Sequence, residues 1–85
     1  MVVYVVISQA YGPHARPNGY VILKKIECDA IPKNVKNLKS NHLELHTDIY
    51  METYYDNLES AMRHYRADCD AYRRNPGIIK YPPDM

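Results

Sequence analysis

The chain contains no tryptophan and no phenylalanine, and it has only three glycines and two cysteines. Tyrosine supplies all of the aromatic surface, and its hydroxyl needs a partner or water, so these rings suit the boundary of a core better than its centre. Two cysteines, Cys28 and Cys69, are too few for a disulfide framework, so we expect free thiols in a reducing compartment. Three glycines are also too few for a glycine-rich phosphate-binding loop.

Long apolar stretches are absent as well. No run approaches the roughly 20 residues that span a bilayer, and residues 1–7 lack the basic start and cleavage site of a signal peptide. We therefore expect no membrane association and a cytoplasmic location, which for a viral protein would be the host cytoplasm. The formal net charge is +1, with a basic first half and an acidic stretch over residues 42–72, so neither sign dominates.

The chain is organised around residues 42–55, where apolar and polar side chains alternate. Alternation with period two predicts a strand with one buried face and one solvated face, and the solvated face carries Tyr50, Glu52 and Tyr54. Asp56 and Glu59 have the spacing of a capping box, which predicts a helix from Leu58 to Arg74. Its apolar stripe is formed by residues at helical spacing: Leu58, Ala61, Met62, Tyr65, Cys69 and Tyr72.

The rest of the chain predicts further strands. Residues 2–7 form a β-branched run, typical of a strand that is covered on both faces or central in its sheet. After a loop over residues 12–19, which contains the turn-forming pair Asn18-Gly19, residues 20–31 predict a return strand. Its buried row is Ile22, Ile26, Cys28 and Ala30, interrupted by Lys24. Residues 33–41 predict a solvated connection, and residues 78–81 predict a short edge strand or a packed tail.

These elements predict a single domain, 1–85, of the α+β class. We expect a small antiparallel sheet of three strands, or four if residues 78–81 join it, with one long helix packed on one face. The second face of the sheet has no predicted cover. A sheet face without a cover indicates a surface for self-association or for a partner.

Catalytic and metal-binding chemistry find little support. His42, Glu44, His46 and Asp48 share one strand face, but the two histidines are too far apart to converge on an ion. His14 and His64 are not predicted to meet in one cleft with a carboxylate, and the serines lack a nucleophile motif. We therefore expect no enzyme activity, no catalytic residues, no metal site and no cofactor.

Protein recognition is the favoured function. Tyrosine and arginine anchor protein interfaces, so the predicted partner-binding residues are Tyr50, Glu52 and Tyr54 on the central strand, with His14 and Arg16 at the hairpin tip. A homodimer is one form that such binding could take. The alternative is nucleic-acid binding by the basic hairpin and by the lysine-rich connection with Lys33, Lys36 and Lys39.

The overall makeup adds a resemblance. A tyrosine-rich chain without tryptophan, phenylalanine or a catalytic motif resembles the small accessory proteins of bacteriophages, the anti-CRISPR proteins among them. The resemblance implies a non-enzymatic protein that inhibits a host factor by stoichiometric binding. It rests on composition and carries over no residue roles.

Overall fold

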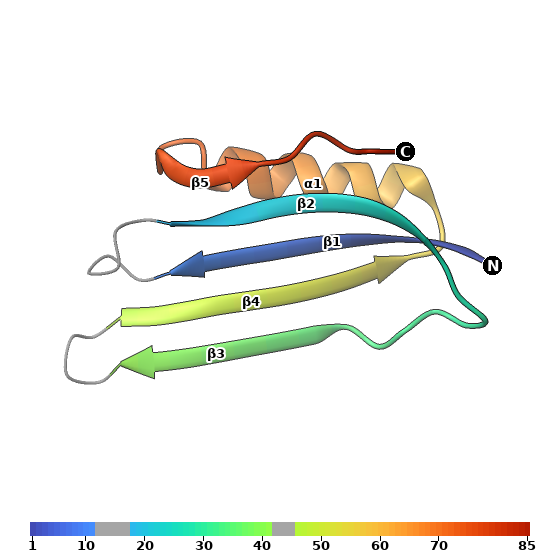
Figure 1. Ribbon diagram of the computed structural model, residues 1–85, viewed down its shortest axis with the longest axis horizontal. Helices are drawn as coiled ribbons and strands as arrows, with labels where there is room; N and C mark the ends of the chain where they lie inside the picture. Colours follow the sequence, from blue (N-terminus) through green and yellow to red (C-terminus); the bar gives the residue numbers. More distant parts are fainter. Residues whose placement is uncertain (12–17, 42–45) are drawn as a thin grey trace.

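The computed structural model describes residues 1–11, 18–41 and 46–85, with the backbone alone described at residues 40, 41, 46 and 47. The elements are β1 (Val2–Tyr11), β2 (Asn18–Glu27), β3 (Val35–Asn41), β4 (His46–Tyr55), α1 (Leu58–Ala71) and β5 (Gly77–Lys80). The strands form one mixed sheet in the order β3-β4-β1-β2-β5, and α1 lies against one of its faces (Figure 1). The predicted α+β class with one covering helix is confirmed, and the sheet has five strands rather than three or four.

The prediction of a solvated connection over residues 33–41 is wrong. Val35–Asn41 forms β3, which pairs antiparallel with β4 from Val35 opposite Glu52 to Asn41 opposite His46. Val35 to Lys39 are all exposed. An edge strand needs hydrogen bonds on one side only and can keep its side chains in water, and lysines are common on such edges. Its composition therefore resembles that of a loop.

The predicted final edge strand is confirmed, and it makes the sheet mixed. β5 runs parallel to β2, and the Tyr81 amide continues the contact by donating to the Val21 carbonyl at 3.0 Å. β4 and β5 point the same way, so the chain between them must cross the sheet. α1 makes that crossing over β1 and β2 (Figure 1), which explains why only one face is covered.

The core lies between α1 and the sheet. Its buried residues come from four elements and are Val6, Val21, Leu23, Ala61, Tyr65 and Ile78. The buried row predicted for β2 is therefore wrong, because Val21 and Leu23 face the helix while Ile22 and Ile26 lie on the other side. Both rows of β2 are apolar, so alternation alone could not choose between them.

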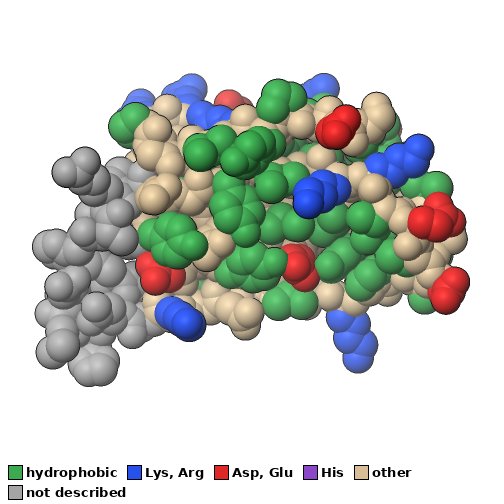
Figure 2. Space-filling view, in the orientation of Figure 1, with side chains coloured by type: hydrophobic (Ala, Val, Ile, Leu, Met, Phe, Trp, Pro, Cys, Tyr) green, Lys and Arg blue, Asp and Glu red, His purple; other side chains and the backbone are tan. Residues whose placement is uncertain are grey.

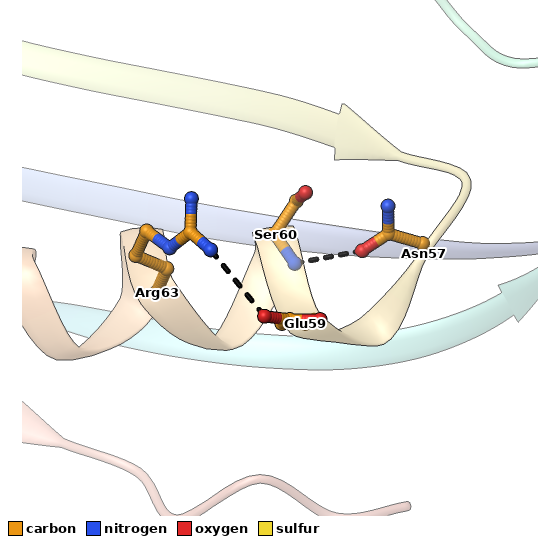
Figure 3. Close-up of polar contacts among 4 residues, drawn as sticks. All are labelled: Asn57, Glu59, Ser60 and Arg63. Atoms are coloured by element: carbon orange, nitrogen blue, oxygen red, sulfur yellow. Dashed lines mark hydrogen bonds and ion pairs between the residues drawn. The ribbon is translucent and has the colours of Figure 1, made fainter.

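Asn57, rather than Asp56, caps α1. Its backbone is extended (φ −134°, ψ 143°) and its Oδ1 accepts the Ser60 amide at 2.8 Å (Figure 3). Glu59 does not complete a capping box and instead pairs with Arg63 at 3.4 Å. The helix ends at Ala71, three residues before the predicted end. Within the described part of the chain, no helix is long and apolar enough to cross a membrane.

Candidate interaction surface

The sheet face opposite α1 is the candidate site, and we call it the open face. It is formed by alternate residues of neighbouring strands: Val3, Val5, Ile7 and Gln9 of β1, Tyr20, Ile22, Lys24 and Ile26 of β2, Asp48, Tyr50, Glu52 and Tyr54 of β4, and Val35, Asn37 and Lys39 of β3. Among the described residues, no helix or further strand lies over it (Figure 1). Hydrophobic side chains make up most of its middle, with acidic and basic side chains among them (Figure 2).

Three predicted residues of β4 form one hydrogen-bonded unit on this face. The Tyr50 hydroxyl donates to Oε1 of Glu52 at 2.5 Å, and the Tyr54 hydroxyl donates to Oε2 at 3.0 Å. Residues two apart on a strand lie on the same face, about 7 Å from each other, so two phenol rings flank one carboxylate. All three side chains are partly buried.

The two tyrosines are held in their neutral form. The hydrogen bond to Glu52 is the main reason that the pKa of Tyr50 rises to about 12, with burial and the Glu52 charge adding to it. Burial raises the pKa of Tyr54, and the bond to Glu52 contributes in the same direction. A phenol that donates to a carboxylate loses that bond on ionisation, so the pair favours the protonated tyrosine.

An apolar strip lies beside this unit. In register with Tyr54 stands Val5, which is 3% exposed, and Ile7 stands opposite Glu52. On the far side of β1, Ile7 pairs with Ile22. β1 is apolar on both rows, as predicted. On the open face, Val5 lies between Lys24 of β2 and Tyr54 of β4.

A shallow hollow of about 250 Å³ marks one end of the open face. Its walls come from β1, β3 and β4 and are formed by Gln9, Tyr11, Asn37, Lys39, Asp48, Ile49 and Tyr50. Gln9 lies in register with Tyr20 on one side and Tyr50 on the other. The hollow therefore combines aromatic walls with amide and charged groups.

The other predicted site residues are not gathered here. His14 and Arg16 lie outside the described residues. Lys36 is in register with Met51 and Lys39 with Asp48, so these lysines point to opposite faces of the sheet, and Lys33 precedes β3. The lysines at period three therefore do not share one face.

Lys24, a basic residue of the nucleic-acid alternative, belongs to the open face. It is exposed and stands in register with Val5, directly across β1 from Tyr54. Its signal in the sequence was the interruption of an apolar row. In the described part of the chain, neither Lys24 nor Glu52 belongs to an ion pair.

A second series of polar side-chain contacts lies on the helix side of the sheet. The Tyr55 hydroxyl is 2.8 Å from Nδ1 of His64, and Nε2 of His64 is 3.1 Å from Asp68. These contacts join β4 to α1, and the three side chains are partly buried. Among the residues the structure describes, no three His, Cys, Asp or Glu side chains gather as metal ligands. Three members of the predicted polar row, His42, Glu44 and His46, have no described side chain.

The chain matches no protein-family model, and no curated protein and no solved structure is significantly similar to it.

Proposed function

We propose that the protein is a small non-enzymatic binding domain whose open face holds a protein partner in a stoichiometric complex. One observation carries the proposal: a carboxylate, held by the hydroxyls of Tyr50 and Tyr54, stands on a largely apolar sheet face over which no described helix or strand lies. Protein interfaces combine an apolar centre with tyrosines and a polar rim, and the open face has this composition.

The chemistry of the unit indicates what the partner presents. A carboxylate has about four lone-pair positions, and the two tyrosine hydroxyls occupy two of them. The remaining positions favour an arginine or lysine, and the flanking phenol rings add a cation–π attraction. The partner surface is therefore apolar with a basic side chain at its centre.

The resemblance in makeup to phage accessory proteins directs the search for this partner. Such proteins act on bacterial host factors, so a bacterial lysate is the appropriate source. We propose inhibition of a host protein by occupation of its surface as the mode of action. The nucleic-acid alternative stays a prediction. It is the less favoured of the two functions, because Lys36 and Lys39 lie on opposite faces of the sheet and do not line one groove.

The test is affinity capture from bacterial lysate with tagged wild-type protein, followed by measurement of binding to the purified captured protein. We expect one protein at equimolar ratio. Glu52→Lys should weaken its binding at least 30-fold, the effect of losing about 2 kcal/mol at an interface centre. The matched control is Glu59→Lys, which makes the same charge change on the exposed flank of α1 and should leave the affinity unchanged.

A second variant separates the rings from the charge. Tyr50→Ala combined with Tyr54→Ala removes both rings and should also abolish capture, with circular dichroism checking that the fold persists. Equal binding by wild type, Glu52→Lys and the double alanine variant would assign the interaction to another surface and contradict the proposal.

A further inference from the structure

We propose that a second copy of this chain occupies the open face in the free protein, forming a two-fold symmetric dimer in which Lys24 of each copy meets Glu52 and Tyr54 of the other. The inference rests on the proposed function, because it uses the same open face and the same carboxylate, Glu52, as the group that binds a basic side chain. The dimer is the resting form, and a protein partner would compete with the second copy.

The distribution of charge on the open face carries the argument. Lys24 on β2 and Glu52, one of the two acidic residues of β4 on this face, lie on either side of β1. From the register their Cα positions are about 10 Å apart across the sheet and about 7 Å along it, and no ion pair joins these two described side chains within one copy. Both side chains belong to the open face, where a facing surface can meet each of them with the opposite charge.

Two-fold symmetry with the axis along β1 supplies such a surface. The axis places β2 of one copy over β4 of the other. Lys24 and Tyr54 are both in register with Val5, so Lys24 of one copy faces Tyr54 of the other. Glu52 is one two-residue step away along β4. Stacked sheets lie about 10 Å apart, a gap that a lysine and a glutamate can bridge by extending toward each other.

The alternative symmetry axis, perpendicular to the strands, is disfavoured by charge. It would place β4 over β4 and β2 over β2, so that Glu52 and Lys24 would each face the strand of the other copy that carries the same charge. Like charges that face each other in a desolvated interface repel and disfavour the complex. The pattern of charge therefore selects the axis along β1, in which each interaction occurs twice.

The size of the face is sufficient for a stable dimer. β1, β2 and β4 each have 10 residues and β3 has 7, so at 3.3 Å per residue and 4.8 Å between strands the flat area of the face is on the order of 600 Å². A standard protein interface needs about 800 Å² of accessible surface from each partner, and projecting side chains raise the accessible area above the flat area. The partly exposed middle of the face, at Ile7 and Ile22, is apolar, as dimer interfaces require.

Charge reversal tests the arrangement. Sedimentation equilibrium of the wild type should give twice the chain mass of 9.9 kDa. Lys24→Glu and Glu52→Lys should each be monomeric at the same concentration, because each makes both symmetric contacts repulsive. Mixed together, they should form a one-to-one heterodimer, in which both contacts join opposite charges again. Lys25→Glu, the matched change on the neighbouring exposed residue of the opposite row, should remain dimeric.

Each other outcome overturns the dimer. The dimer is contradicted if the wild type is monomeric at several hundred micromolar. It is also contradicted if Lys24→Glu and Glu52→Lys stay dimeric, or if they are monomeric and do not associate when mixed. Dissociation of the Lys25→Glu dimer would contradict it too. A monomeric wild type that still captures a protein through Glu52 would remove the dimer and leave the proposed function in place. A charge-dependent dimer that captures no protein from the lysate would support the dimer and contradict the proposed function.

Discussion

The hydroxyl of Tyr50 lies 2.5 Å from Oε1 of Glu52, two residues along the same face of β4. This contact raises the pKa of Tyr50 to about 12, so we expect Tyr50 to ionise well after a free tyrosine does. Glu52→Gln keeps an acceptor of the same shape and removes the charge, and it should lower this pKa. The difference between the absorbance titrations of wild type and Tyr50→Phe isolates this residue. Glu59→Gln should leave the titration unchanged.

The same shift predicts how stability depends on pH. The unfolded chain has tyrosine pKa values near 10, while folded Tyr50 ionises near 12. Between these values the folded state binds more protons than the unfolded state, so the free energy of unfolding falls as pH rises. The contribution is complete below pH 10 and is lost between pH 10 and 12. Urea denaturation across this range should show a shallower decline for Tyr50→Phe; an unchanged slope would mean that the bond does not persist in solution.

The cap of α1 gives a second prediction. Asn57 accepts the Ser60 amide, so Asn57→Ala should lower the free energy of unfolding by about 1 kcal/mol, the usual cost of losing a side-chain cap. Asp56→Ala tests the cap that the sequence predicted and should cost much less. Chemical denaturation of the two variants decides between the residues. A larger loss for Asp56→Ala would show that the capping box forms after all.

The fold was predictable where one pattern pointed to one structure. Alternation predicted a strand over β4 and helical spacing predicted α1, and both elements were correct in type. α1 begins at the predicted residue and ends three residues early, and β4 ends at Tyr55 as predicted. β3 was not, because an exposed edge strand with Lys36, Leu38 and Lys39 has no buried face to leave a period-two signal. On the open face, the tyrosines and Glu52 could be predicted from β4. Lys24 could not, because its role depends on the register between β2 and β4, which are separated by β1.

Gly19 gives a third prediction, and its position differs from that expected. Asn18 and Gly19 were predicted to form a hairpin turn, yet both lie in β2, where Gly19 pairs with Ala10 and has φ +152°. A Cβ at this position would lie 1.9 Å from the Gln9 carbonyl oxygen. Gly19→Ala should therefore shift the backbone and cost about 1–3 kcal/mol, as overpacking does. Thermal denaturation measures the loss, and stability equal to wild type would contradict the close approach.

The hydroxyl of Tyr65 gives a fourth prediction. It donates to the Tyr81 carbonyl at 2.6 Å, which ties the core side of α1 to the segment after β5. Tyr65→Phe keeps the ring and leaves that carbonyl without its donor, so it should lower the free energy of unfolding by about 1 kcal/mol. Hydrogen exchange should also be faster at the Tyr81 amide, which donates to Val21. If exchange there is unchanged, the hydroxyl does not hold this segment.

The last prediction compares two leucines that the sequence alone does not distinguish. Leu23 lies in the core under α1 and is 1% exposed, whereas Leu38 lies on the edge strand β3 and is 57% exposed. Leu23→Ala removes buried methyl groups and leaves a cavity, so it should cost about 2–5 kcal/mol. Leu38→Thr replaces an exposed side chain with a β-branched one that suits a strand, so it should change stability by less than about 0.5 kcal/mol. Urea denaturation of both variants tests the placement of β3 at the edge. A loss at Leu38 comparable to that at Leu23 would mean that β3 is covered in solution.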